Sequence, residues 1–187
     1  MNNKTKTMVG VGLLTAIVVV LQMLGGGIRF GIFSISLVLV PIVVGAALYG
    51  WQAGGWLGFA FGMTVLLNGD AAPFMAVNVL GTIVTVLVKG AGCGIAAGLV
   101  YKLLKQYRWV AVILAAVICP VVNTGIFLVG CKLFFFETIS AWGAAAGFEN
   151  AASYMFIGLA GVNFLVELGT NIVLAPVIVR LIRIGQK

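Results

Sequence analysis

Apolar segments follow one another along almost the whole chain, from Met8 to Ile184, with only short polar breaks between them. Charged residues make up 8% of the 187 residues, whereas a soluble domain carries about 25%. A chain of this kind buries its apolar surface in lipid rather than in a soluble core. We therefore predict one membrane-embedded domain that covers residues 1–187.

Hydropathy and turn residues divide the chain into six apolar segments. They cover residues 8–24, 36–50, 52–67, 79–104, 109–133 and 154–182. The pattern predicts an all-α integral membrane protein whose six transmembrane helices form one compact bundle. The second and third segments are short and share the tight connection GAALYGWQAGG, so a shallow helical hairpin is the alternative to two full spans. The stretch ISLVLVPIVVGAALYG lacks the polar lining that a re-entrant pair needs, which favours two spans.

The basic residues indicate the orientation, because Lys and Arg concentrate in cytoplasmic loops. With both termini cytoplasmic, eight of the eleven basic residues fall on the inner side. They are Lys4, Lys6, Lys102, Lys105, Arg108, Arg180, Arg183 and Lys187. The outer side then receives Asp70, Glu137 and Glu149. We interpret the net charge of +7 as a topology signal, and we expect no nucleic-acid-binding surface.

The three predicted outer connections, residues 25–36, 68–78 and 134–153, mix aromatic, small and polar side chains. This composition suits lids that pack over a cavity, and an aromatic belt at the lipid headgroups is the alternative. Both interpretations stay open for Trp142. A lid is favoured for the first connection, which contains Arg29, because it is too short to span the membrane and too apolar to extend freely into water. We count Arg29 and Trp142 among the candidate substrate-binding residues.

Lys89 lies near the middle of the fourth segment. A charged side chain at that depth costs roughly 2.5 to 3.5 kcal/mol on insertion scales, so it normally faces a partner, a cavity or a ligand. Thr82 and Thr85 precede it at helical spacing and extend a polar stripe toward the outer side. The stripe predicts that Lys89 and Thr85 point into the bundle.

Two other segments place polar residues at the depth of Lys89. Asn163, Glu167 and Asn171 recur every four residues in the sixth segment, and Asn123 follows Pro120 in the fifth. At 1.5 Å per residue, Lys89, Asn123 and Glu167 each lie about 15 Å from a membrane surface in a core about 30 Å thick. The cluster suits a midplane binding site lined by Lys89, Thr85, Asn123, Asn163 and Glu167. A structural Lys89–Glu167 ion pair is the alternative, and the two can coexist.

Other chemistries lack the residues that they require. The chain has no His, and its three Cys residues have no CxxC spacing, so we expect no metal centre, no cofactor and no His-based catalysis. A Gly-x-Gly pattern at Gly92 and Gly94 lies inside a spanning segment, where no dinucleotide loop forms. No GxxxxGK[ST] phosphate loop is present. We expect a protein that is not an enzyme.

Small residues recur every four positions in three segments, which places them on one helical face where backbones approach closely. The series are Gly54, Gly58 and Gly62; Gly90, Gly94 and Gly98; and Gly12 and Ala16. Packing inside the bundle explains the first two series. The pair Gly12 and Ala16 has the same spacing and suits a partner subunit equally well.

The chain resembles the substrate-binding S components of energy-coupling factor (ECF) vitamin transporters. The likeness is carried by LVLVPIVVGAALYGWQAGGWLGFAFG, GTIVTVLVKGAGCGIAAGLVYKLL and CPVVNTGIFLVG, and it covers essentially the whole chain as a pattern of six segments. The resemblance implies a bacterial or archaeal cell-membrane protein that captures a vitamin from outside. It also implies a membrane T component and two cytoplasmic ATPases as partners, with Gly12 and Ala16 on the face that meets the T component.

The ligand is predicted only by its charge. A midplane lysine favours a molecule with a carboxylate, so pantothenate is the first candidate and folate a second. If Glu167 neutralises Lys89, a neutral vitamin such as riboflavin fits as well. An alternative function is a stand-alone ion-coupled carrier in which Lys89 and Glu167 form a relay. The short chain without inverted halves argues against this alternative.

Overall fold

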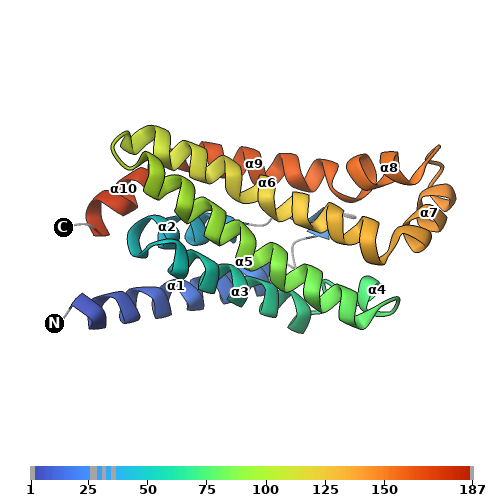
Figure 1. Ribbon diagram of the computed structural model, residues 1–187, viewed down its shortest axis with the longest axis horizontal. Coiled ribbons are helices and arrows are strands. Elements are labelled where there is room, and N and C mark those ends of the chain that lie inside the picture. Colours follow the sequence, from blue (N-terminus) through green and yellow to red (C-terminus); the bar gives the residue numbers. More distant parts are fainter. Residues whose placement is uncertain (1–2, 26–28, 31–32, 35–36, 186–187) are drawn as a thin grey trace.

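The computed structural model of the protein describes residues 3–25, 29–30, 33–34 and 37–185, and this part of the chain is almost entirely helical (Figure 1). The principal helices are α1 (Asn3–Gly25), α2 (Leu39–Tyr49), α3 (Trp51–Leu67), α5 (Val79–Leu104), α6 (Arg108–Phe134), α9 (Gly161–Val173) and α10 (Ala175–Gly185). Shorter elements are α4 (Ala72–Met75), α7 (Phe136–Ala145), α8 (Ala151–Ser153) and the π-helix η1 (Tyr154–Leu159). Two short strands, β1 (Arg29–Phe30) and β2 (Phe33–Ser34), pair antiparallel.

The predicted all-α membrane class is confirmed, since all six apolar segments contain helices. Four stretches of the described chain are long and apolar enough to cross a membrane: Lys4–Gly25, Val79–Leu104, Arg108–Phe134 and Ala151–Val173. The sixth segment is not one regular helix, because it is divided among η1, α9 and α10. Helix α2 has only 11 residues. The count of six spans therefore stays a prediction.

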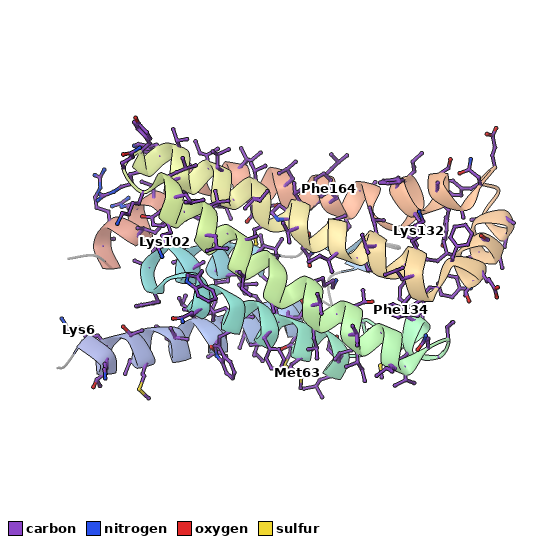
Figure 2. All side chains as sticks on the ribbon, in the orientation of Figure 1. Lys6, Met63, Lys102, Lys132, Phe134 and Phe164 are labelled. Atoms are coloured by element: carbon purple, nitrogen blue, oxygen red, sulfur yellow. The ribbon has the colours of Figure 1, made fainter. Side chains whose placement is uncertain are left out.

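The first and last helices bring both ends of the chain to one end of the molecule, which we call the terminal end (Figure 1). The turn between α5 and α6 lies at this end too, whereas α4, α7 and α8 lie at the opposite end, the distal end. In Figure 2, Lys6 and Lys102 lie at the terminal end and Lys132 lies toward the distal end. Lys6 and Lys102, two of the residues predicted to be cytoplasmic, therefore share one end, and the membrane orientation of that end stays a prediction.

Helix α2 is the most enclosed element of the bundle. Eight of its residues are buried, and they occur on every side of the helix: Leu39, Pro41, Ile42, Val43, Val44, Gly45, Ala46 and Ala47. A helix that is apolar all round belongs in the interior rather than at a surface. Gly50, with φ 94°, then turns the chain directly into α3, because this conformation suits a residue without a Cβ.

Glycines bring α3 and α5 into backbone contact. A Cβ atom at Gly58 would overlap the carbonyl oxygen of Gly90, and one at Gly54 would overlap that of Gly94. The predicted packing role of these two glycine series is confirmed. Helix α5 begins at Asn78, whose Oδ1 accepts a hydrogen bond of 2.9 Å from the Gly81 N–H. The capped N-terminus of α5 and its close contact with α3 together determine where Lys89 lies relative to α3.

Candidate functional site

Lys89 lies ten residues into α5 and is partly buried between two aromatic rings. Its Nζ is 5.7 Å from the ring centroid of Phe61 on α3 and 5.3 Å from that of Phe127 on α6. The negative face of an aromatic ring attracts an ammonium group, and the attraction grows when water is excluded. Within the described residues Lys89 forms no salt bridge. The rings support the charge without neutralising it.

Glu167 on α9 is buried, with 3% of its surface exposed. Its carboxylate accepts hydrogen bonds of 3.2 Å from the Asn163 Nδ2 and 3.5 Å from the Asn123 Nδ2. The first bond lies within α9, and the second joins α9 to α6. The structure thus brings together three of the predicted site residues, and it confirms the meeting of Asn123 and Glu167 that their common depth indicated.

Several buried polar atoms on α5, α6 and α9 have no hydrogen-bond partner in the described structure. They are Thr85 Oγ1, Asn123 Oδ1, Asn163 Oδ1, and both amide atoms of Asn171. The unpaired oxygens of Asn123 and Asn163 follow from the orientation of the two amides. Only the amide nitrogen can donate to a carboxylate, so the amide oxygen points away from Glu167. An unsatisfied buried polar group costs about 1–3 kcal/mol. The cluster is therefore incomplete until another polar group meets it.

Thr82 does not join this set. Its hydroxyl donates a 2.7 Å hydrogen bond to the Asn78 carbonyl one turn earlier in α5. Thr85, one turn closer to Lys89, is buried without such a bond. Thr82 of the predicted polar stripe is therefore satisfied within α5, whereas the role of Thr85 and Lys89 in binding stays a prediction.

An aromatic cluster lies between the distal end and Lys89. Phe74 of α4 makes edge-to-face contacts with Phe127, Phe135 and Trp142, at centroid distances of 5.6, 5.2 and 5.7 Å. Phe127 also contacts Lys89. We call Phe74, Phe127, Phe135 and Trp142 the aromatic cap. Trp142 is thus partly buried against Phe74, which in turn contacts Phe127, the ring beside Lys89.

Two predicted features lie outside the described residues in whole or in part. The side chain of Arg29 is one of them, so its role in binding stays a prediction. The first connection, residues 25–36, is described only at β1 and β2, so its role as a lid also stays a prediction. The second connection is anchored, because Asp70 accepts hydrogen bonds of 2.8 Å from Gln22 and from Asn68.

The surface of α1 carries the two small residues predicted to meet a partner. Gly12 and Ala16 are both exposed, and a Cβ at Gly12 would meet no atom within 4 Å. A separate groove of about 340 Å³ lies between α1 and α3 and is lined by Val19, Met23, Trp56, Phe59 and Met63, among others. Figure 2 shows Met63 on the outside of the bundle. This groove contains none of the residues of the polar cluster.

The fold and the cluster define a multi-pass membrane protein with a buried polar cluster. Among the described residues, no three His, Cys, Asp or Glu side chains gather where they could hold a metal ion. A family profile described as "ECF transporter, substrate-specific component" matches residues 6–179. The chain therefore belongs to the substrate-specific components of ECF transporters, which are transport subunits and not enzymes. No curated protein and no solved structure matched the chain in the two other comparisons.

Among the aromatic residues of the candidate site, sequence reasoning identified Trp142 but missed the phenylalanines. Phe61, Phe74 and Phe127 look like any other phenylalanine of an apolar segment or loop. One signal was available for Phe127, because it follows Asn123 by four residues and so shares its helical face. Asn171 was recognised as part of the polar series on α9 but was not among the predicted binding residues.

Proposed function

We propose that this protein captures a water-soluble vitamin or a related small molecule from outside the cell. A membrane T component and two cytoplasmic ATPases then drive its release inside. Membership of the S-component family supports the division of labour, and the chain itself contains no phosphate loop for ATP hydrolysis. The function requires that a polar molecule bind within the membrane domain.

The observation that carries this proposal is the incomplete polar cluster. Lys89 holds a positive charge without a salt bridge, and Thr85, Asn123 and Asn163 present buried atoms without partners. Charged and polar groups at this depth are expensive unless they serve a ligand or an ion. A bound polar molecule would satisfy them together. We include Arg29 and Trp142, from the first and third distal connections, as residues that close over it.

Pantothenate is the first candidate for the bound molecule. Its carboxylate would meet the Lys89 ammonium in a charge-assisted hydrogen bond, and its hydroxyl and amide groups would meet Thr85, Asn123 and Asn163. Glu167 is occupied by two amide donors rather than by Lys89, so the ammonium is available to an anion. Folate carries carboxylates as well and is the second candidate.

The exposed pair Gly12 and Ala16 on α1 is the proposed contact for the T component. Small residues four positions apart let a partner helix approach closely, and close approach is what drives helix association in lipid. We place both termini in the cytoplasm of a bacterial or archaeal cell. The basic residues at the terminal end support this orientation.

Binding to the isolated protein tests the capture function directly. Purified protein in detergent is incubated with an equimolar mixture of pantothenate, folate, riboflavin, biotin, thiamin, pyridoxine and nicotinate. Unbound molecules are then removed, and the retained one is identified by mass spectrometry. We expect one vitamin to be retained at close to one molecule per protein, with pantothenate first. Retention of none of them would contradict capture of a vitamin.

A further inference from the structure

Asn171 is among the most deeply buried polar residues of the described chain, and its surroundings leave it without partners. Its exposed fraction is 1%, and neither its amide nitrogen nor its amide oxygen forms a hydrogen bond. A buried amide whose polar groups are unsatisfied destabilises the fold. An apolar residue at this position would avoid that cost.

The helical register places Asn171 beside a particular part of α6. Helices α6 and α9 pack against each other and run in opposite directions, as Figure 1 shows. The hydrogen bond between Asn123 and Glu167 fixes which residues are level. Asn171 lies four residues beyond Glu167, which is about 6 Å closer to the terminal end. Because α6 runs in the opposite direction, the matching position on α6 is four residues before Asn123. Asn171 therefore lies level with Cys119 and Pro120.

Pro120 leaves a backbone acceptor free in this layer. A proline within a helix has no N–H, so the carbonyl four residues earlier, that of Ala116, loses its helical hydrogen bond. Ala116, Pro120 and Asn123 are all buried and recur at i, i+4 and i+7, which is one face of α6. Asn123 of that face meets Glu167, so the free carbonyl lies on the face turned toward α9.

We infer that Asn171 and the Ala116 carbonyl form a polar subsite, one layer deeper than Glu167, that binds a hydroxyl or amide group of the captured molecule. The subsite offers one N–H donor group and two acceptor oxygens, so its occupant must both donate and accept hydrogen bonds. Hydroxyl and amide groups meet this requirement, whereas a carboxylate or an ammonium group does not. Lys89 and Thr85 then hold another part of the same molecule. This inference rests on the proposed capture function.

A bound molecule that reaches Asn171 would also explain why a polar residue occupies this position, one helical turn beyond Glu167. A bound molecule that reached only Lys89 would leave Asn171 buried beyond it with no partner. A molecule that extends along α9, past Asn163 and Glu167, satisfies the whole polar series. A trapped water can donate and accept in the same way. The experiment must therefore separate a water from a group of the bound molecule.

The vitamin mixture described above provides the probe, applied to the wild type and to Asn171→Leu. The leucine side chain removes both amide functions and cannot hold a water by hydrogen bonds. We expect Asn171→Leu to reduce the affinity for the retained vitamin about tenfold, the loss expected for one or two hydrogen bonds. We also expect its melting temperature without vitamin to stay equal or rise. Thr170→Val, which changes the preceding residue on another face of α9, is the control and should bind as the wild type does.

The outcomes separate the inference from the proposed function. Unchanged affinity in Asn171→Leu, with a raised melting temperature, would show a trapped water or an empty gap and would overturn the subsite while leaving capture intact. Retention of nicotinate, which has neither a hydroxyl nor an amide group, would overturn it too. If the wild type retains nothing, capture fails and the subsite fails with it. Should Asn171→Leu not fold, Asn171→Ala removes the same groups without added bulk, and the same tenfold loss is expected.

Discussion

Lys89 shows how a membrane domain can hold a charge ready for a ligand. Two rings, those of Phe61 and Phe127, flank its ammonium, and the described residues give it no carboxylate partner. A salt bridge would have satisfied the charge permanently and would have to break before an anion could bind. Cation–π contacts contribute less, on the order of 1–2 kcal/mol, and leave the hydrogen-bonding directions of the ammonium free.

Replacing Lys89 tests this role at a single side chain. Lys89→Met keeps the length and apolar character of the side chain and removes the charge. We expect the affinity for pantothenate to fall by about 1–3 kcal/mol, the scale of a charged hydrogen bond. The melting temperature should change little, because Glu167 keeps its two amide donors. Isothermal titration and thermal unfolding measure the two quantities.

The control is Lys132→Met, which removes an exposed charge near the distal end and should leave the affinity unchanged. A structural ion pair gives the opposite pattern. In that case Lys89→Met would unfold at a clearly lower temperature, and adding Glu167→Gln would restore both stability and full binding.

Most polar residues of the candidate site were predictable from the sequence, whereas the phenylalanines around Lys89 were not. Lys89, Asn123 and Glu167 stand out because polar side chains at the middle of a membrane segment are rare and expensive. Their common depth predicted that they meet. The hydrogen bond from Asn123 to Glu167 shows this for two of them, whereas the contacts of the Lys89 ammonium are with the Phe61 and Phe127 rings. An aromatic side chain carries no such signal, since lipid and protein interior accept it equally.

At the scale of elements, glycine spacing sets the distance between α3 and α5. Gly58→Ala should lower the stability by about 1–3 kcal/mol, since the added Cβ meets the Gly90 backbone, which cannot move aside as a side chain can. Gly12→Ala is the matched control on α1. A Cβ there meets nothing, so stability should stay equal or rise by up to about 1 kcal/mol through helix propensity. Thermal unfolding of both variants gives the comparison, and equal stability losses would contradict the packing account.

Helix α4 brings the centre of the aromatic cap to the site. Phe74→Ala removes all three ring contacts of that residue, so we expect a bound vitamin to dissociate several-fold faster, because the covering above Lys89 loosens. Phe156→Ala, at a side chain that is 62% exposed, is the control. Stopped-flow displacement measures the rates. An unchanged dissociation rate in Phe74→Ala would show that the cap only stabilises the fold.

The structure of two apolar segments could not be predicted from hydropathy. Segment 36–50 reads as a short span, and the structure places α2 in the interior, where neighbours on all sides allow a uniformly apolar helix. Segment 154–182 reads as one span, and the structure divides it at η1 and again before α10. Both features arise from packing between segments. Hydropathy averaged over neighbouring residues of one segment carries no information about such packing.

For the whole molecule, the surface of α1 is the proposed docking face for the T component. Ala16→Phe should abolish vitamin uptake in cells that contain the complete transporter, because a bulky side chain prevents close helix approach. Binding of the vitamin to the purified variant should stay intact, since Ala16 is exposed and distant in sequence from the polar cluster. Ile17→Phe is the control, because Ile17 is exposed and lies on a different face of the same helix, and uptake in this variant should stay normal. Normal uptake in Ala16→Phe would place the T component elsewhere.

Uptake into vesicles tests most directly whether this protein is the capture subunit of an ATP-driven importer. Vesicles contain either the protein alone or the protein with a T component and two ATPases, and uptake of radiolabelled pantothenate, or of the vitamin retained from the mixture, is measured with and without ATP. We predict accumulation only with the complete assembly and ATP. Accumulation by the protein alone, driven by an ion gradient and abolished in Glu167→Gln, would contradict this account and support a stand-alone carrier in which Lys89 and Glu167 form the relay.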